Sequence, residues 1–537
     1  MQTQLILTIL LPLATAVLLL FMRNASRETV RWTALLVTIA TLVSSVMLAS
    51  TSLRVAPDGA AFAVTSAEWL PPASGIDVRF HFGLDGLSLW LFVLSSVLMF
   101  TSVLVSWEAI QERAALFYGM LMLLTAGCLG VFAARDLLLF YIFFEFTLIP
   151  LFFLIGIWGS EDRRHAAMKF FIFTLTGSLL TFLGLLTIVF WCRSQVGGPL
   201  NFSIPVLTAE LAQVPMPVTL QTVVFLALFA GFAIKVPLFP LHTWLPLAHV
   251  QAPTAGSVFL AGILLKIGTY GFVRFSIPML PDATVQCAPW LIWLSVIGIL
   301  YGALVALAQS DIKRLIAYSS VSHLGFCMLG LFALNSLGTQ GSVLQMVNHG
   351  ISTGALFALV GMVYERYHTR QIASLGGLTR ELPILGFFMV LFTFSSIGLP
   401  GLNGFAGEIM ILLGMFERAF AEGLGDWTAS LKVASILSIT GVVLGAWYML
   451  WLVQRVFFGP RKTPPGETAS DLGFREIVAL IPLAVLVFWI GLYPQFFLRP
   501  LQKPVDELTA RARVVAAEQN LDAAGDVAIV ATLGTGS

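Results

Sequence analysis

The sequence predicts an all-α polytopic membrane protein, because its composition, the length of its apolar segments and their regular recurrence all indicate this class. The chain has 537 residues, of which 58% are hydrophobic and only 11% are charged. A typical soluble domain has about 25% charged residues. Most of the surface of this protein is therefore expected to face lipid.

About fourteen apolar runs recur along the chain, and each is long enough to cross a hydrocarbon core of about 30 Å. Runs of this length form helices in lipid, whereas strands of a membrane barrel would be shorter and would alternate in polarity. The predicted spans are residues 4–22, 31–50, 84–107, 114–133, 135–157, 167–192, 218–247, 253–275, 284–309, 314–334, 341–365, 383–418, 430–458 and 477–497. Arginines follow the first run rather than precede it, so we expect a retained helix and not a cleaved signal peptide.

The basic residues predict an orientation. Lysine and arginine are enriched in cytoplasmic links. If the N-terminus lies outside, the inner links hold most of the 29 lysine and arginine residues. We therefore expect both termini on the outer side of the membrane.

Composition and motifs exclude several functions. The net charge of +1 and the absence of a large basic cluster argue against binding to nucleic acid. The four cysteines have no CxxC spacing, and the chain has no GxGxxG or Walker motif. We expect no cofactor, metal or nucleotide site in this chain.

Lys235 lies inside an apolar segment, between VVFLALFAGFAI and VPLFPL. A charged side chain at this depth costs roughly 3 kcal/mol or more unless it faces protein, water or a partner, which indicates an ion pathway. A lysine that reaches the interface from a helix end is the structural alternative. Pro237, Pro240 and Pro246 follow it and remove backbone donors, so we predict a broken helix here. His242 and His249 come after the break, either at the mouth of a half-channel or as interfacial residues.

Four further ionisable residues lie within predicted spans. Glu145 has no cation within one helical turn, so its partner must come from another helix, unless it is a protonated packing group. Lys266 lies in AGILLKIGTYG, and a buried lysine beside a carboxylate can exchange protons as its neighbours change. His323 and His349 are of the residue type that carries protons near neutral pH. The alternative for each histidine is a hydrogen bond to a serine or a backbone carbonyl.

Glu408 lies in SIGLPGLNGFAGEIMILLG, where Gly398, Pro400 and Gly401 predict a second broken helix. Interrupted segments at corresponding positions in two halves of a chain are typical of inverted-repeat transporters with a site near the midplane. The repeat is not visible as residue identity, because Lys235 precedes its proline and Glu408 follows.

Three segments closely resemble the antiporter-like membrane subunits of respiratory complex I. They are GFAIKVPLFPLHTWLPLAHVQAPTAGSVFLAGILLK, AQSDIKRLIAYSSVSHLGF and GLPGLNGFAGE, and the resemblance covers roughly residues 80–460. It implies a proton-pumping subunit in the membrane arm of a NADH:quinone oxidoreductase, in a bacterial plasma membrane, with two inverted five-helix repeats. The implied divisions are 1–110 (three helices and an external loop), 111–280 and 281–460 (the two repeats) and 461–537 (a final helix and a polar tail).

The resemblance also implies functional residues and partners. The family's proton-transfer residues match Glu145, Lys235, Lys266, His323, His349 and Glu408. Glutamate rather than lysine at position 408 distinguishes this chain from the sister chains L and N, which are expected partners together with the other membrane-arm subunits and the lipid bilayer. Leu247 and Gln251 stand where relatives commonly have acids, so an acidic group at the channel mouth is missing.

The expected mechanism follows from this resemblance. Protons enter from the inner side near Lys235, pass through Lys266, His323 and His349 in that order, and leave by Glu408. An ion pair between Glu145 and Lys235 acts as the switch.

Three other functions remain open at this stage: an Mrp-type cation/proton antiporter, a membrane-bound hydrogenase or formate hydrogenlyase subunit, and a purely structural scaffold. The C-terminal segment is compatible with an amphipathic helix and a flexible end, and its sequence suggests no function.

Overall fold

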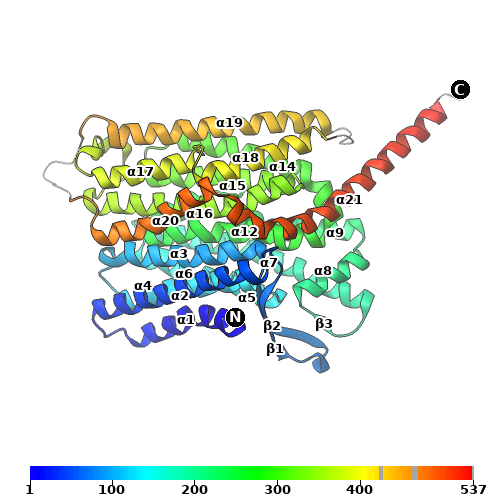
Figure 1. The fold of residues 1–537 in the computed structure, drawn as a ribbon, viewed down its shortest axis with the longest axis horizontal. Coiled ribbons are helices and arrows are strands. Elements are labelled where there is room, and N and C mark those ends of the chain that lie inside the picture. The colour runs from blue at the N-terminus through cyan, green and yellow to red at the C-terminus, as the bar shows by residue number, and fades with distance from the viewer. Residues whose placement is uncertain (422–426, 463–469, 535–537) are drawn as a thin grey trace.

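The computed structural model describes residues 1–421, 427–462 and 470–534, with side chains up to residue 516. Long helices lie roughly parallel in one bundle, and the β-strands, α8 and α21 gather at one end of it (Figure 1). Within the described residues, thirteen helical segments are long and apolar enough to cross a membrane. The prediction of an all-α polytopic membrane protein is confirmed.

The first half of the chain contains a three-stranded sheet and the first set of membrane helices. Its elements are α1 (Gln2–Phe21), α2 (Arg27–Val55), β1 (Phe62–Leu70), β2 (Ile76–Leu84), α3 (Gly86–Ala109), α4 (Ala114–Ala133), α5 (Leu137–Phe146), α6 (Leu148–Trp158), α7 (Arg163–Val196), β3 (Leu200–Asn201), α8 (Ile204–Gln213), α9 (Val218–Lys235), α10 (Trp244–Gln251), α11 (Thr254–Phe259), the π-helical segment η2 (Leu260–Leu264), α12 (Leu265–Gly271), the π-helical segment η3 (Phe272–Ser276) and α13 (Ile277–Met279). The strands were not predicted. β1 and β2 pair antiparallel inside the predicted external loop, and β3 pairs parallel to β2.

The second half is entirely helical among the described residues. Its main elements are α14 (Pro281–Leu307), α15 (Ile312–Phe332), α16 (Ser336–Tyr367), α17 (Pro383–Ser396), α18 (Asn403–Ala419), α19 (Thr428–Val453), the π-helical segment η7 (Gln454–Phe458), α20 (Phe474–Leu492) and α21 (Gln495–Gly534). The predicted divisions at residues 110, 280 and 460 fall in connecting segments between these elements. The inverted repeats and the domain division stay predictions.

Both predicted helix breaks are present. Residues 236–243 separate α9 from α10, directly after Lys235. Residues 397–402 separate α17 from α18, where Gly398 and Gly401 have φ angles of 74° and 91°. L-residues with side chains rarely adopt such angles, so glycine permits this turn. The predicted span 383–418 is therefore two half-helices, and neither of them is among the thirteen long spans.

A third interruption was not predicted. The span that holds Glu145 is divided at Thr147, where α5 ends and α6 begins. Pro150 explains it, since a proline inside a helix lacks a donor and its ring clashes with the carbonyl of the preceding turn. Glu145 therefore lies beside a backbone irregularity and not in a continuous helix.

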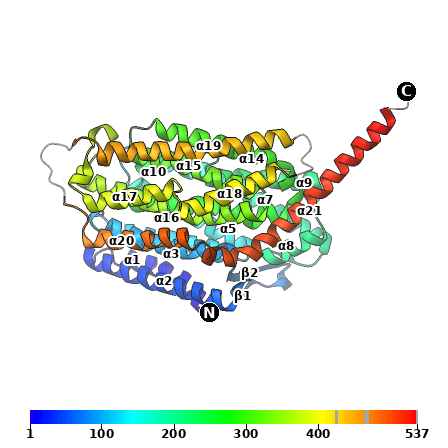
Figure 2. The same ribbon diagram turned by 45° about the horizontal axis from the view of Figure 1, so that its top comes forward.

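The bundle has a buried centre and edges with exposed apolar side chains. α1 and α2 form one edge and α19 the other in both views (Figures 1 and 2). The most apolar stretches of α16 and of the α11–α13 segment are fully buried. In the corresponding stretches of α1, α2 and α20, most residues are not buried. α16 packs against α3, α15 and α18. A polar side chain on α16 consequently lies among protein groups.

The two ends of the bundle are distinguished by their loops. The terminal face carries the β1–β2 hairpin, α8 and α21, and Gln2 donates a hydrogen bond from its amide to the carbonyl of Val64 in the hairpin (2.6 Å). The opposite face carries the α3–α4, α6–α7, α10–α11 and α14–α15 connections, which are tied together by bonds such as Ser160 N–H to the Gln251 carbonyl (2.9 Å). Both ends of the described chain belong to the terminal face.

The C-terminal segment is a 40-residue helix, α21, that extends beyond the bundle (Figure 1). Its first part crosses the terminal face: Trp90 donates from Nε1 to the Phe497 carbonyl (2.9 Å), and Ser336 donates to Asp506 (2.5 Å). The predicted helix is present and longer than expected. The last three residues of the expected flexible end, 535–537, lie outside the described residues.

A buried charge cluster joins the two halves of the terminal face. Asp85 caps α3 by accepting from the Ser88 N–H (3.2 Å), and it accepts from Arg274 (2.7 Å) with Arg135 at 3.7 Å. Burial alone would raise the pKa of Asp85, but the charges and hydrogen bonds of Arg274, with Arg135, outweigh it and hold this pKa below its usual value of 3.8.

The substitution Asp85→Asn is expected to destabilise the protein by about 3 kcal/mol, because it leaves two partly buried guanidinium groups without their anion. Thermal unfolding of the solubilised protein measures this. A carboxylate with a lowered pKa contributes stability above its unfolded pKa and loses it as the pH falls, so the wild type should lose this advantage over Asp85→Asn below about pH 4. Lys503→Met, which removes an exposed pair with Asp58, serves as the control and should change little. Equal unfolding temperatures for Asp85→Asn and wild type would contradict this account.

Candidate functional site

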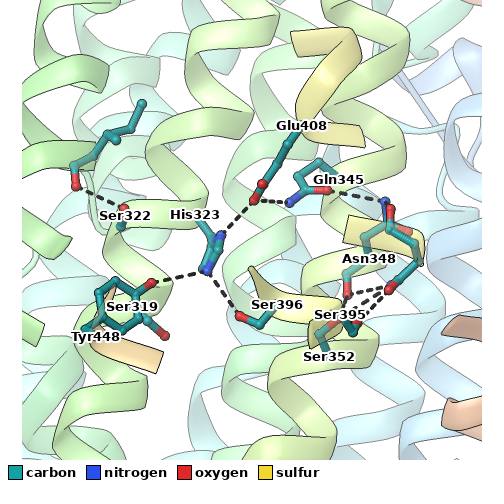
Figure 3. Close-up of polar contacts among 12 residues, drawn as sticks. Ser319, Ser322, His323, Gln345, Asn348, Ser352, Ser395, Ser396, Glu408 and Tyr448 are labelled. Carbon is teal, nitrogen blue, oxygen red and sulfur yellow. Dashed lines mark hydrogen bonds and ion pairs between the residues drawn. The ribbon is translucent and has the colours of Figure 1, made fainter. Parts of the chain in front are cut away.

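The second helix break carries a histidine–glutamate pair. His323 of α15 places Nδ1 at 3.1 Å from Oε1 of Glu408 on α18, and the two side chains are only 7% and 6% exposed (Figure 3). Gln345 of α16 donates from Nε2 to the same carboxylate oxygen (3.0 Å). Three helices thus converge on one buried carboxylate, in the second turn of α18 after the break.

The other ring nitrogen of His323 contacts hydroxyl groups. Its Nε2 lies 3.3 Å from Ser396 Oγ and 3.4 Å from Tyr448 Oη. A hydroxyl can donate or accept, so these partners accommodate either tautomer of the imidazole. His323 can therefore hold a proton on either nitrogen without losing its contacts.

The second pair lies between α12 and α16. Lys266 Nζ is 2.6 Å from Nδ1 of His349, and it also donates to the carbonyl of Ala261. Lys266 is fully buried and His349 is 3% exposed. Nε2 of His349 has no hydrogen-bond partner in the described structure. A buried polar atom without a partner costs free energy, so this nitrogen is an expected site for water or for proton exchange.

The two pairs are neighbours. The rings of His323 and His349 are 5.7 Å apart between centroids. A cavity of about 10 Å³ lies between them, lined by both histidines and by Gln345, Asn348, Ser352 and Ser396 among others. This is close to the smallest volume that holds one water molecule, and the lining is polar. The order is thus Lys266, His349, His323, Glu408, and the predicted order of the two histidines is wrong.

Polar side chains of α16 fix the break between α17 and α18. Asn348 donates to the Asn403 carbonyl (2.7 Å), Ser395 donates to Asn403 Oδ1 (2.6 Å), and the hydroxyls of Ser352 and Ser395 are 2.5 Å apart (Figure 3). An irregular backbone at membrane depth is tolerated only where protein or water satisfies it. These bonds set the position of α18, and with it Glu408.

Lys235 is at the C-terminal end of α9 and is 3% exposed. Its ammonium group lies 4.9 Å from the centre of the Phe144 ring. The predicted ion pair with Glu145 is not formed: none of the ion pairs within 4.0 Å among the described residues joins them, and Oε1 of Glu145 is buried without a partner. The ring of Phe144, the residue before Glu145 near the end of α5, lies next to the Lys235 ammonium group. The interaction of the two charges is therefore through space and not by direct contact.

Lys235 and Lys266 belong to packed helices without a direct link. A Cβ atom on Gly268 of α12 would lie 2.9 Å from Cβ of Lys235, so the helices approach closely there. No hydrogen bond joins the two lysine side chains in the described part of the chain. The structure brings together four of the six predicted residues in one row and leaves Glu145 and Lys235 to one side.

Several polar residues near the row were not predicted. Gln345, Ser396 and Tyr448 are ordinary residues in apolar helices, and only the fold shows that they meet Glu408 and His323. Lys313 is 6% exposed and donates to the Ala252 carbonyl (2.6 Å). The predicted spans 284–309 and 314–334 leave Lys313 in the link between two helices.

The two histidines after the first break are buried. His242 is 3% exposed and its ring lies 5.1 Å from that of Tyr301. His249 is fully buried, stacks on Phe357 at 4.4 Å, and has no hydrogen-bond partner on either ring nitrogen within the described residues. Both histidines are therefore packed inside the protein.

The sequence comparisons agree with one another. Residues 134–425 match the model of the family described as NADH:quinone oxidoreductase/Mrp antiporter, transmembrane. NADH-ubiquinone oxidoreductase chain 4 of Chondrus crispus is 40% identical over 93% of this chain and 96% of its own length. NADH-quinone oxidoreductase subunit M of Rhodobacter capsulatus is 39% identical over 92% and 94%.

Solved structures share the fold. A chain of respiratory complex I from Thermus thermophilus with bound NADH superposes with a TM-score of 0.81, at 33% identity over 95% of this chain and 99% of that chain. A chain of the Mrp complex from Dietzia sp. DQ12-45-1b has a TM-score of 0.77 at 19% identity, over 96% and 100%. The second likeness shows only that the fold is shared.

Proposed function

The chain belongs to the subunit M (chain 4) family of NADH:quinone oxidoreductase, and on this premise we propose that it moves protons across the membrane through its row of buried Lys, His and Glu side chains. The row (Lys266, His349, His323 and Glu408) is the observation that carries this proposal. Each member of the row has a side chain that can take up and release a proton. Neighbouring members are in contact, or are separated by a cavity the size of one water molecule.

Proton transfer along the row needs only small movements. A proton on Lys266 can pass to Nδ1 of His349 over 2.6 Å; the other nitrogen of that ring has no partner in the described structure, and the residue lines the polar cavity. From the cavity the proton reaches His323, whose Nδ1 is 3.1 Å from Glu408. A histidine accepts at one nitrogen and releases from the other, which makes it suited to such a relay.

Direction follows from the expected orientation. With the terminal face outside, α18 leads from Glu408 toward the outer side, so protons are taken up at the opposite face and released beyond Glu408. The location that fits this orientation is a bacterial plasma membrane with both termini on the periplasmic side, as the distribution of lysine and arginine favours.

Glu145 and Lys235 act as the switch in this proposal. One oxygen of the Glu145 carboxyl group is buried without a partner, and the Lys235 ammonium group lies over the Phe144 ring and is in no ion pair among the described residues, so this pair can form when Glu145 moves. When Glu145 moves toward Lys235, the pair favours the charged lysine; when it moves away, the proton on Lys235 is released. Lys235 is packed against the helix of Lys266, so its charge acts on the start of the row.

The chain acts as a translocating subunit without a redox centre of its own. We assign no cofactor to it, and quinone reduction takes place elsewhere in the complex. Its partners are the other membrane-arm subunits, including the sister chains L and N, and lipid, which the exposed apolar side chains of α1, α2, α7 and α19 would contact.

The substitution His349→Phe tests this function, because it keeps an aromatic ring but removes the link between Lys266 and His323. We expect NADH-driven proton uptake by inverted membrane vesicles and quinone reduction to fall about a hundredfold or more, because a proton-transfer group typically contributes about 10² to 10⁴ in rate. NADH oxidation with an artificial acceptor that bypasses the quinone should be unchanged. His165→Phe at the exposed start of α7 is the control. Normal pumping by His349→Phe would refute the proposed row.

A further inference from the structure

The row has no visible proton source in the contacts described above. Lys266 is fully buried, and its direct partners are His349 and the Ala261 carbonyl. Lys235, the expected entrance, makes no hydrogen bond to it. A proton must nevertheless reach Lys266 from the opposite face.

A cavity of about 430 Å³ opens at that face between α3, α11, α15 and α16. Its lining includes Glu108, Lys313, Glu365, His368 and Arg370. Oε1 of Glu365 is buried and has no hydrogen-bond partner within the described residues. The cavity is large enough for many water molecules and has titratable groups of both signs.

Lys313 forms the inner wall of this cavity. It is 6% exposed, and the carbonyl of Ala252 at 2.6 Å is the one hydrogen-bond partner that the described structure gives to its ammonium group. Asp311, two residues earlier, pairs with Arg370 at 3.5 Å. It also caps α15 by accepting a hydrogen bond from the Arg314 N–H. Lys313 is therefore a buried cation without a carboxylate in contact, in the same situation as Lys235 and Lys266.

His249 is on α10, three residues before the carbonyl that binds Lys313, and it stacks on α16, the helix that carries His349, the partner of Lys266. The ammonium groups of both lysines are near enough to act on the His249 ring electrostatically. Its ring is held flat against Phe357, with an interplanar angle of 6°, and both nitrogens lack partners in the described structure. A fully buried imidazole with two unsatisfied nitrogens is costly unless water or a transferred proton serves them.

We propose that this cavity, Lys313 and His249 form the proton entrance of the row, leading from the opposite face to Lys266 without passing through Lys235. A proton from water in the cavity is taken up by the Glu365 carboxylate and passes to the neutral amine of Lys313. The Lys313 ammonium then gives a proton to one nitrogen of His249, and the other nitrogen releases one to the neutral amine of Lys266. Each step moves one proton and leaves the donor one charge lower, and water bridges the gaps because no direct hydrogen bond joins these side chains.

This inference rests on the proposed function, and lysine chemistry allows the two to be tested separately. Arginine keeps the positive charge and can still donate to the Ala252 carbonyl, but it does not release its proton; histidine does. We expect Lys313→Arg to lower NADH-driven proton uptake by vesicles about a hundredfold or more, and Lys313→His to retain most of it. His249→Phe, which preserves the stack on Phe357, should behave like Lys313→Arg.

Arg314→Met, at the exposed neighbouring position, is the control, and assembly is checked by the amount of intact complex and by NADH oxidation with the artificial acceptor. Wild-type pumping by Lys313→Arg, or loss of pumping by both Lys313→Arg and Lys313→His with intact assembly, would overturn the entrance. If His349→Phe abolishes pumping while Lys313→Arg pumps normally, only the entrance is wrong. If His349→Phe also pumps normally, the proposed function fails with it.

Discussion

Replacement of Glu408 by glutamine is expected to have the largest effect of any single change in this chain. Glutamine keeps the size of the side chain and a hydrogen-bonding oxygen for Gln345, but it can neither bind nor release a proton. The row would then end at His323, with no acceptor toward the outer face. We expect quinone reduction and proton uptake to fall about a hundredfold or more, within the range of about 10² to 10⁴ seen when a general acid or base is lost.

The same preparation supplies its controls. Glu417→Gln changes an exposed glutamate on the same helix and should leave both rates unchanged. Glu408→Asp keeps the carboxyl group but shortens its reach to His323, so it should retain part of the activity. A Glu408→Gln enzyme that pumps at the wild-type rate would show that protons leave by another route.

Replacement of Lys235 by alanine is expected to have an effect of similar size. It removes the buried ammonium group beside Phe144 and with it the charge that responds to Glu145. Lys235→Arg should be nearly as impaired, because arginine keeps the charge permanently and the switch requires its release. Glu145→Gln should also slow quinone reduction. Proton uptake by vesicles and NADH oxidation with the artificial acceptor distinguish loss of pumping from loss of assembly.

A fixed structural role for Lys235 predicts a different pattern. In that case Lys235→Arg would retain activity, since the ammonium–aromatic contact tolerates a guanidinium group well. Lys235→Met would then differ from wild type only in stability. Such a result would remove Glu145 and Lys235 from the mechanism while leaving the row of four residues in place.

The sequence predicted those features that carry a strong local signal. Charged residues inside apolar runs are rare, so Lys266, His323, His349 and Glu408 could be singled out, and the structure brings them together. Prolines after Lys235 and glycines before Glu408 located two of the helix breaks. Pro150 marked the third in the same way, but its surroundings are so apolar that the span looked continuous.

The contacts between helices could not be predicted from the sequence. The order of His349 and His323 depends on how α12, α15 and α16 pack, and the sequence contains no measure of that packing. The Glu145–Lys235 ion pair was expected from the opposite charges of the two residues and from the family resemblance. In the structure the Phe144 ring, near the end of α5, lies next to the Lys235 ammonium group instead. Lys313 falls in the link between the predicted spans 284–309 and 314–334, and only the structure shows that it is buried and donates to the Ala252 carbonyl.

The central claim, that protons cross the membrane through Lys266, His349, His323 and Glu408, is tested most directly by counting protons moved per electron in proteoliposomes that contain the purified complex with Lys266→Met. Electron transfer in the wild type is slowed to the same rate by limiting NADH, and Lys169→Met on α7 is the matched lysine control. The account predicts fewer protons per electron for Lys266→Met and the wild-type ratio for Lys169→Met. An unchanged ratio for Lys266→Met would contradict it.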